Sequence, residues 1–221
     1  MDRALVIGAS GGIGAALVGA LEQSGVQVVG LSRRRDGLDL RNPETIERVL
    51  EQIEETFDAI LLATGILSPE GRAPEKTLTA LDASVMTDVM QVNAIGPAMI
   101  LRHVPRLLPR RGRSVLGVLS ARVGSIGDNS LGGWHSYRAS KAALNQIVRG
   151  AAIELGRTHP EAVVALLHPG TVATPFTEAY APSYQKLTPA EAAGRLLVVL
   201  DQLTPAQTGR CWDHAGREVP W

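Results

Sequence analysis

Short apolar runs alternate along the chain with longer stretches in which apolar residues recur every three or four positions. The short runs are rich in β-branched and aliphatic residues and predict buried strands, whereas the longer stretches have the period of amphipathic helices. This alternation is typical of βαβ units, so we expect an α/β fold with a Rossmann-type, doubly wound parallel β-sheet and helices on both faces. The expected strands are residues 4–7, 26–31, 59–63, 115–120, 163–168 and 210–213, and the expected helices are residues 12–24, 81–108, 136–156 and 189–203.

One further helix is expected after Asn42 and Pro43, a capping residue followed by a proline suited to a first helical turn. Its apolar side chains form a single stripe, and that face must pack on the sheet. Within the expected helix 81–108, Pro97 and Pro105 are expected to interrupt the regular hydrogen bonding. The stripe consists of Ile46, Val49, Leu50, Ile53 and Phe57.

The length of 221 residues suits one α/β domain and is short for two. We therefore expect a single domain over residues 1–221, with no linker inside it. Two segments rich in proline and polar residues, 68–79 and 175–187, are expected to be loops, and we expect the second to be a short substrate loop. In an open parallel sheet, ligands bind outside the carboxyl ends of the strands, so functional residues should lie there.

Composition excludes several classes of function. The 22 basic and 22 acidic side chains balance, which gives no electrostatic reason to expect nucleic acid or an anionic membrane as partner. No stretch is apolar enough to cross a bilayer, and the N-terminal residues lead into the first expected strand instead of forming a signal peptide. Cys211 is the single cysteine and the five histidines have no ligand spacing, so we expect no disulfide, no metal site and a cytoplasmic setting.

A glycine-rich turn follows the first expected strand and leads into a helix. A tight turn, a close backbone approach to a pyrophosphate and free N–H groups at a helix start all favour glycine here, so Gly8, Gly12 and Gly14 predict a dinucleotide site. A sharp strand-to-helix connection without a ligand is the alternative. The turn reads Gly8, Ala9, Ser10, Gly11, Gly12, Ile13 and Gly14, of which all but Ala9 are candidate cofactor contacts.

The second expected strand ends in a basic turn. NAD is usually held here by an acidic residue that binds the ribose hydroxyls, whereas NADP needs a cation for its 2′-phosphate. Neither Asp nor Glu occupies residues 31–33, so Ser32, Arg33 and Arg34 predict a phosphate clamp. We therefore expect NADP(H) to be preferred without excluding NAD(H). A solvated basic turn is the alternative.

Tyr137 and Lys141 stand four residues apart near the start of an expected helix, so both can point into one cleft. A free phenol has a pKa of about 10, and a neighbouring cation lowers it by favouring the phenolate. The pair therefore predicts a proton donor and acceptor near neutral pH. The alternative is a tyrosine packed in the core beside a surface lysine.

At this point the chain resembles the short-chain dehydrogenase/reductase family. The likeness runs over almost the whole length, and motifs in the right order carry it. Residues 120–127 and the tail ending in Pro220 and Trp221 resemble the C-factor-like branch, which is similar to small carbonyl reductases. The matching positions are Gly8, Gly12 and Gly14, then Asp39 and Leu40, residues 93–96, Ser120, Tyr137 and Lys141, and residues 169–174.

The resemblance implies roles for these residues. Tyr137 would exchange a proton with the carbonyl or alcohol oxygen while hydride passes to or from the nicotinamide. Lys141 would bind the nicotinamide ribose and lower the pKa of Tyr137, and Asn93 would hold a water that links Lys141 to solvent. The implied cofactor contacts also include Asp39 and Leu40 at the adenine, Ala63, Thr64 and Gly65 beside the adenosine ribose, and Pro169, Gly170, Val172 and Thr174 at the carboxamide.

Two positions depart from the family pattern. Leu62, Ala63, Thr64 and Gly65 stand where Asn-Asn-Ala-Gly is common, so side-chain bonds that brace the sheet are missing. The second departure concerns the serine that orients the substrate in this family. Its place falls on Ala121 when residues are counted from the end of the strand, and on Gly124 when they are counted back from Tyr137. Ser120 is our first prediction for this role and Ser125 the second.

The resulting hypothesis is an NADP(H)-dependent oxidoreductase that transfers hydride between the nicotinamide and a small carbonyl or alcohol. The rival hypothesis is a nucleotide-binding signalling or sensor protein with low turnover, which Ala121 favours and the presence of Asn93, Tyr137 and Lys141 opposes. Trp134, Tyr180 and Tyr184 are expected to line the substrate pocket, although packing explains them nearly as well. The resemblance also implies a homodimer or homotetramer formed through the long helices.

Overall fold

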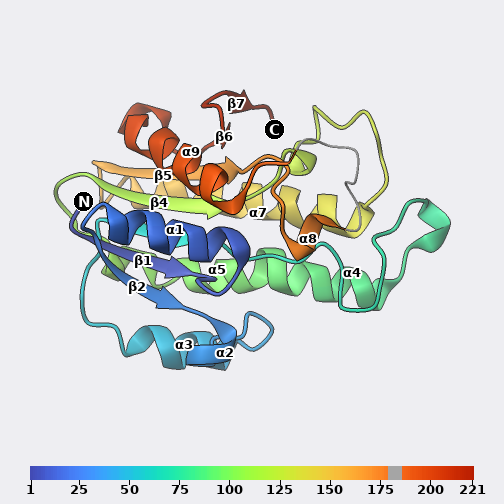
Figure 1. Ribbon diagram of the computed structural model, residues 1–221, viewed down its shortest axis with the longest axis horizontal. Helices are drawn as coiled ribbons and strands as arrows, with labels where there is room; N and C mark the ends of the chain where they lie inside the picture. Colours follow the sequence, from blue (N-terminus) through green and yellow to red (C-terminus); the bar gives the residue numbers. More distant parts are fainter. Residues whose placement is uncertain (179–185) are drawn as a thin grey trace.

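Seven strands form one sheet in the order β2-β1-β3-β4-β5-β6-β7 in the computed structural model, which describes residues 1–178 and 186–221 (Figure 1). All neighbouring strands are parallel except β7, which runs antiparallel to β6. The predicted Rossmann-type α/β fold is therefore confirmed. The strands are β1 Arg3–Ile7, β2 Gln27–Leu31, β3 Ala59–Leu62, β4 Ser114–Leu119, β5 Ala162–His168, β6 Arg210–Asp213 and β7 Glu218–Val219.

Helices cover both faces of the sheet. Successive strand residues point to opposite faces, so Leu5 and Ile7 of β1 join one apolar core while Ala4 and Val6 join the other. Helices α1 (Gly12–Gln23) and α9 (Pro189–Gln202) pack on the second of these cores. The opposite face is covered by α3 (Pro43–Glu51), α5 (Gly96–Leu101) and α7 (His135–Leu155) (Figure 1).

Helix α3 begins where the sequence predicts. The Asn42 side chain accepts a hydrogen bond from the Glu44 N–H at 3.0 Å, and Pro43 occupies the first turn. The helix ends at Glu51, so Phe57 lies beyond it. Phe57 is nevertheless buried, because its backbone N–H donates to the Leu107 carbonyl and its ring joins the core under the sheet.

The helix expected at 81–108 is divided into four pieces. Helix α4 (Ala83–Met90) leads into a π-helical segment η2 (Gln91–Ile95), and α5 and α6 (Val104–Leu107) follow. Pro97 lies in the first turn of α5, where its missing N–H removes one regular hydrogen bond, and a wider turn directly precedes it. The predicted interruption at the prolines is therefore present, and the wider turn is a feature that the pattern did not indicate.

Shorter elements lie in the connections. The segment 175–187, which was expected to be a loop, begins with a helical turn, because Pro175 suits the first position of a helix. Tyr180 and Tyr184 lie outside the described residues. No helix within residues 1–178 and 186–221 is long and apolar enough to span a membrane. The short elements are α2 Arg33–Asp36, α8 Pro175–Glu178 and the 3₁₀ turns η1 Leu78–Ala80, η3 Arg122–Gly124 and η4 Pro205–Gln207.

Candidate active site

The glycine turn joins β1 to α1 at the carboxyl end of the sheet. The N–H groups of Gly8 and Ala9 both donate to the Leu31 carbonyl at the end of β2, at 2.9 and 3.0 Å. Gly8 has a φ of +94°, and a Cβ on Gly14 would lie 2.1 Å from the Gly8 carbonyl oxygen. Gly11 precedes α1 and no side chain caps that helix, so its first N–H groups face the turn without a side-chain acceptor. Such a helix start is suited to an anion.

The segments that follow β3 and β5 lie close to this turn. A Cβ on Gly8 would lie 2.6 Å from the Ala63 carbonyl oxygen, and one on Gly12 would lie 2.8 Å from the Thr174 methyl carbon. The segment 63–65 after β3 and the segment 169–174 after β5 therefore both approach the turn. These residues come from distant parts of the sequence and were predicted to bind one cofactor. In the fold they lie together.

The basic turn after β2 forms the short helix α2. Ser32 is buried and its hydroxyl accepts from the Arg35 N–H, while its own N–H donates to Asp36 at 2.7 Å. Arg35 pairs with Asp36 at 3.2 Å. Arg33 and Arg34 are exposed and form no ion pair within the described residues, so both guanidinium groups are available to an anionic ligand at this end of the sheet.

Asp39 and Leu40 lie between α2 and α3. The Asp39 carboxylate accepts from the Arg41 N–H at 3.0 Å, and the Leu40 carbonyl accepts from the Gln91 side chain at 3.2 Å. A Cβ on Gly96 would lie 2.6 Å from the Leu40 Cβ, so this connection is packed tightly against the start of α5. It therefore has a defined position beside the sheet edge that carries the basic turn.

Tyr137 and Lys141 lie one turn apart near the start of α7, and both are buried. The Lys141 ammonium donates to the Leu119 carbonyl at the end of β4 at 3.0 Å and lies 6.0 Å from the centre of the Tyr137 ring. Tyr137 lines a cavity of about 690 Å³ at this end of the sheet, whereas Lys141 lies behind it. The two side chains thus have the common orientation that their spacing predicts.

Burial sets the protonation of this pair in the protein alone. It raises the pKa of the Tyr137 phenol above its ordinary value and lowers the pKa of the Lys141 ammonium to about 8. Burial is the cause of the raised pKa of the phenol, and the lowering of that pKa by Lys141 stays a prediction. A phenol in this state is a proton donor.

Asn93 lies in the π-helical segment and is fully buried. Its amide exchanges two hydrogen bonds with the backbone of Ile66, both at 2.8 Å, and donates a third to the Ser140 hydroxyl at 3.0 Å. Ser140 in turn donates to the Tyr137 carbonyl. A Cβ on Gly65 would lie 3.2 Å from the Asn93 oxygen and 3.3 Å from the Lys141 nitrogen. Asn93 therefore ties the segment after β3 to the tyrosine-bearing helix.

The two predicted serines are engaged elsewhere. The Ser120 hydroxyl donates to the Asn145 side chain of α7 at 2.6 Å, and the Ser125 hydroxyl accepts from the Asp128 N–H at 3.1 Å. Neither lines the cavity, whereas Ala121 does. The reason is alternation: the backbone at Ala121 is extended, so neighbouring side chains point to opposite sides. The hydroxyl expected to orient the substrate is thus replaced at the cavity wall by a methyl group.

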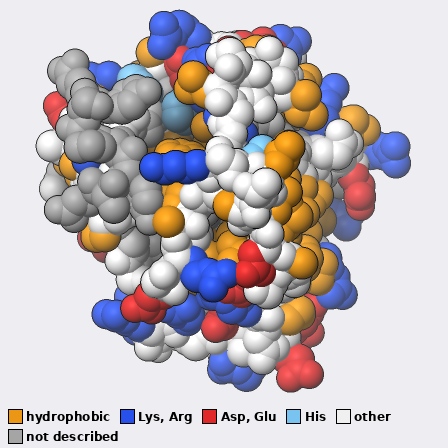
Figure 2. All heavy atoms as spheres, turned by 90° about the vertical axis from the view of Figure 1, so that its right-hand side faces the viewer, with side chains coloured by type: hydrophobic (Ala, Val, Ile, Leu, Met, Phe, Trp, Pro, Cys, Tyr) orange, Lys and Arg blue, Asp and Glu red, His pale blue; other side chains and the backbone are white. Residues whose placement is uncertain are grey.

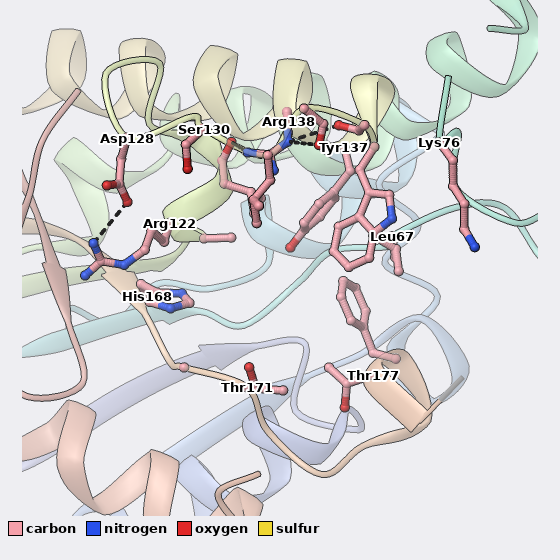
Figure 3. A pocket seen from close by; sticks show the side chains of 18 residues that line it. Leu67, Lys76, Arg122, Asp128, Ser130, Tyr137, Arg138, His168, Thr171 and Thr177 are labelled. Atoms are coloured by element: carbon pink, nitrogen blue, oxygen red, sulfur yellow. Dashed lines mark hydrogen bonds and ion pairs between the residues drawn. The ribbon is translucent and has the colours of Figure 1, made fainter. Parts of the chain in front are cut away.

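A cavity of about 690 Å³ opens beside Tyr137 (Figure 3). This volume lies in the range of small-molecule sites, about 300–1,000 Å³. The Tyr137 ring stands edge-on to Trp134 and Phe176, with centroids 6.4 and 5.8 Å away. Trp134 lines the cavity, as expected. The remaining lining residues include Leu67, Lys76, Ala121, Arg122, Asp128, Ser130, Leu131, Arg138, His168, Gly170, Thr171 and Thr177.

The loop 68–79 is anchored on the start of α7. The buried Glu75 carboxylate accepts hydrogen bonds from the Ser136 hydroxyl and from the Ser136 N–H, and the Trp134 N–H donates to the Glu75 carbonyl. A carboxylate at a helix N-terminus complements the positive end of the helix dipole. Sequence reasoning missed Glu75, because the signal for this contact depends on a loop path that periodicity does not predict.

A Rossmann-type sheet with a glycine turn at one strand end and a tyrosine–lysine pair beside a cavity defines a nucleotide-binding oxidoreductase scaffold. The sequence pattern of the family described as short chain dehydrogenase matches residues 2–185. The chain belongs to this family.

Several known proteins are similar to this chain. It is 29% identical over 236 residues to 1-hydroxy-2-glutathionyl-2-methyl-3-butene dehydrogenase of Rhodococcus sp. (strain AD45), with 100% of both chains covered. It is 40% identical over 146 residues to C-signal of Myxococcus xanthus, covering 64% of this chain and 81% of that protein.

Solved structures of a short-chain dehydrogenase/reductase and of a carbonyl reductase are also similar to this chain. A short-chain dehydrogenase/reductase from Burkholderia multivorans with bound NADP superimposes with a TM-score of 0.85 at 28% identity, covering 100% of this chain and 99% of that one. A carbonyl reductase from Pseudomonas aeruginosa PAO1 in complex with NADP has a TM-score of 0.80 at 28% identity, with full coverage of both chains. The expected carbonyl-reductase-like relatives are thus confirmed.

Proposed function

We propose that the protein is an NADP(H)-dependent oxidoreductase that transfers hydride between the nicotinamide and a small carbonyl or alcohol, with Tyr137 as acid and base. The observation that carries the proposal is the Tyr137 phenol at the wall of the cavity, with Lys141 directly behind it. The family, which is one of dehydrogenases, supports the reaction class.

The residues fit a dinucleotide. A side chain at Gly14 would collide with the turn, and the start of α1 has no side-chain cap, so backbone N–H groups are exposed to a pyrophosphate. We infer that the turn holds the pyrophosphate through Gly8, Ser10, Gly11, Gly12, Ile13 and Gly14. We further infer that Asp39 and Leu40 meet the adenine, that 63–65 runs beside the adenosine ribose, and that Pro169, Gly170, Val172 and Thr174 hold the carboxamide.

When bound, the dinucleotide supplies or accepts the hydride. In the reducing direction, Tyr137 would give its O–H proton to the carbonyl oxygen, which would gain the C=O π electrons as the carbonyl carbon takes up the hydride. The raised pKa of buried Tyr137 keeps the phenol protonated before this step. Lys141 would stabilise the phenolate that remains and would hold the nicotinamide ribose hydroxyls, and Asn93 would keep the segment after β3 in place beside Lys141.

Tyr137→Phe tests the proton donor. The phenol contributes a proton and little ground-state binding, so we expect kcat to fall by about 10²- to 10⁴-fold while NADPH affinity is nearly unchanged. The measurement is NADPH oxidation against a panel of aldehydes, ketones and quinones, with calorimetric titration of NADPH. Equal activity of variant and wild type would show that the tyrosine has no acid–base role.

NADP preference is supported by Arg33 and Arg34, which are exposed and without an ion pair among the described residues. Removal of both guanidinium groups should weaken NADPH binding by about 10- to 100-fold, because these exposed groups should together contribute about as much as one charge-assisted hydrogen bond, about 1.5–3 kcal/mol. NADH binding should change by less than about 3-fold. Arg35→Ala is the matched control, since Arg35 already pairs with Asp36. Equal weakening of both nucleotides would reject the phosphate clamp.

A low-turnover signalling or sensor protein is the second candidate. The methyl group of Ala121 at the cavity wall favours it, and so does the 40% identity to C-signal over part of the chain. Under this hypothesis the protein would bind NADPH tightly and oxidise it slowly with every carbonyl offered. The substrate panel described for Tyr137→Phe therefore separates the two candidates.

The setting and assembly of the enzyme complete the proposal. We infer a cytoplasmic protein that pairs into a homodimer or homotetramer. Ile95 in η2 and Ile153 in α7 are exposed apolar side chains on the long helices, which supports pairing through them. Light scattering coupled to size-exclusion chromatography measures the assembly directly, and a monomer at micromolar concentration would reject it.

A further inference from the structure

The described side chains around the cavity carry an excess of positive charge. Lys76, Arg122 and Arg138 line it, whereas Asp128 is the single carboxylate among the lining residues of the described chain. His168 adds no charge near neutral pH, because burial and then Arg122 lower its pKa to about 4. The side chains of residues 178–185 lie outside the described part, and Glu178 is the single charged residue among them. The described wall of the cavity is therefore cationic.

Arg122 is neutralised by the protein itself. Its guanidinium contacts Asp128 at 3.1 Å and Asp213 at 3.3 Å, so it lies between two carboxylates. Asp213 is buried and also accepts from Arg217 at 2.9 Å. This network spans η3 and the end of β6 and fixes the left-hand wall of the cavity in Figure 3. Its charges balance, so it is a rigid wall and not a free anion site.

Arg138 keeps its charge. Its guanidinium donates to the carbonyl groups of Gly132, Gly133 and Val123 at 3.2, 3.0 and 3.4 Å. Carbonyl groups orient the side chain without cancelling its charge, and no carboxylate of the described chain lies within 4 Å of it. Arg138 and Tyr137 both line the cavity, so this charge faces the same space as the phenol.

Lys76 is the second uncompensated cation. Its side chain is exposed and forms no ion pair with the described side chains, those of residues 1–177 and 186–221. The adjacent carboxylate, Glu75, is turned to Ser136 at the start of α7. Figure 3 shows Lys76 beyond Leu67, on the side of Tyr137 opposite to Arg122. The cavity thus has a paired cation at one end and a free one at the other.

The space between these charges is apolar. Leu67, Leu131, Trp134 and Phe176 line it together with the Tyr137 ring. Figure 2 looks at the end of the molecule to which the strands point, and hydrophobic and cationic side chains lie side by side there. A ligand that fits has an apolar middle, a reactive oxygen at Tyr137 and a negative group toward Lys76.

We propose that the substrate carries a carboxylate in addition to its carbonyl or alcohol, and that Lys76 binds this carboxylate while Arg138 adds to the attracting field. Lys76 is then a specificity-determining residue. The reactive end of this substrate rests on the proposed function, whereas the carboxylate end rests on the charges alone. An exposed ion pair contributes modestly, so Lys76 should select by several-fold and not by orders of magnitude.

The turnover experiment compares 4-carboxybenzaldehyde with its methyl ester, which differs chiefly in charge. With NADPH and the full chain, we expect a higher kcat/KM for the acid. Lys76→Ala should lower kcat/KM for the acid by about 3- to 5-fold and leave the ester within about 1.5-fold, since exposed pairs have this strength. Lys76→Arg should retain the preference. Arg111→Gln, an exposed cation before the start of β4, is the matched control and should change neither.

A binding experiment makes the result independent of turnover. The protein with NADP⁺ is titrated calorimetrically with 4-methylbenzoate and with methyl 4-methylbenzoate, neither of which can be reduced or oxidised at the site. Preference for the acid that Lys76→Ala removes supports the proposal, and equal binding of acid and ester overturns it. If no aldehyde turns over while the carboxylate preference persists, the proposed oxidoreductase activity fails and this inference stands. If both aldehydes turn over without any Lys76-dependent preference, only this inference fails.

Discussion

Lys141 is a buried ammonium, and replacing it with methionine should stabilise the nucleotide-free protein near neutral pH. Burial lowers its pKa from 10.5 to about 8, so the folded state holds this proton less tightly than the unfolded state. Each pKa unit corresponds to about 1.4 kcal/mol, so charging Lys141 destabilises the folded state by about 3 kcal/mol at pH 7. The variant loses the hydrogen bond to the Leu119 carbonyl, which costs about 1 kcal/mol. The net expected gain is about 2 kcal/mol.

The sign of the pH dependence follows from the lowered pKa of Lys141. Below about pH 8 the lysine is charged in both states and the full penalty applies. Between about pH 8 and 10.5 the unfolded state binds more protons, so the stability of the wild type rises relative to that of the variant. At pH 10 the remaining penalty is about 1 kcal/mol, which the lost hydrogen bond offsets. The advantage of Lys141→Met should therefore disappear by pH 10.

Urea denaturation followed by circular dichroism at pH 7 and pH 10 measures this difference, provided that the m-values of the two proteins agree. Lys76→Met is the control, because Lys76 is exposed and its replacement should change stability by less than about 0.5 kcal/mol at either pH. A wild type more stable than Lys141→Met at pH 7, or a difference that does not change with pH, would refute the reasoning.

Two further predictions concern the glycine turn and the cavity wall. Gly14→Ala should lower the free energy of unfolding by about 1–3 kcal/mol and weaken NADPH binding, because its Cβ would lie 2.1 Å from the Gly8 oxygen. Gly19→Ala in the same helix has open space around its Cβ and should stabilise by about 0.5–1 kcal/mol, and thermal unfolding compares the two. Ala121→Ser should raise kcat/KM for carbonyl reduction by about 2- to 10-fold, the contribution of one hydrogen bond to the substrate oxygen. Steady-state kinetics would contradict this prediction if Ala121→Ser were no faster than wild type.

Most of the sheet could be predicted because its inner strands, β1, β3, β4 and β5, are buried along nearly their whole length. Such strands appear as continuous apolar runs, and the predicted strand bounds agree with the six parallel strands to within one or two residues. Strand β7 has only two residues, pairs with β6 alone and carries no such run, so the pattern could not indicate it. The π-helical segment η2 also has no apolar signature, because it changes the hydrogen-bond register and leaves the composition of the helix unchanged.

The cofactor and proton-handling residues could be predicted because each belongs to a short motif at a strand end or on one helix face. Ser120 could not be oriented from the sequence, since the side on which it lies depends on how far the extended backbone continues past Leu119. The cations of the cavity were missed for another reason. Lys76 and Arg122 come from connections far apart in the sequence, and only the packed fold brings them to one wall.

Trp134 has a further consequence for how this fold can be adapted. It is the single non-glycine residue of the described chain with a positive φ, at +50°, and the residues before it, Gly132 and Gly133, share that conformation. For an L-residue this conformation costs about 1–2 kcal/mol relative to glycine, so every side chain placed at 134 begins from the same backbone deficit. Selection for a wider cavity can therefore reach glycine at this position, where relief of the backbone strain offsets part of the packing that is lost with the indole. Residue 134 is thus a site where a broader range of substrates costs less stability than the same change at a residue with negative φ.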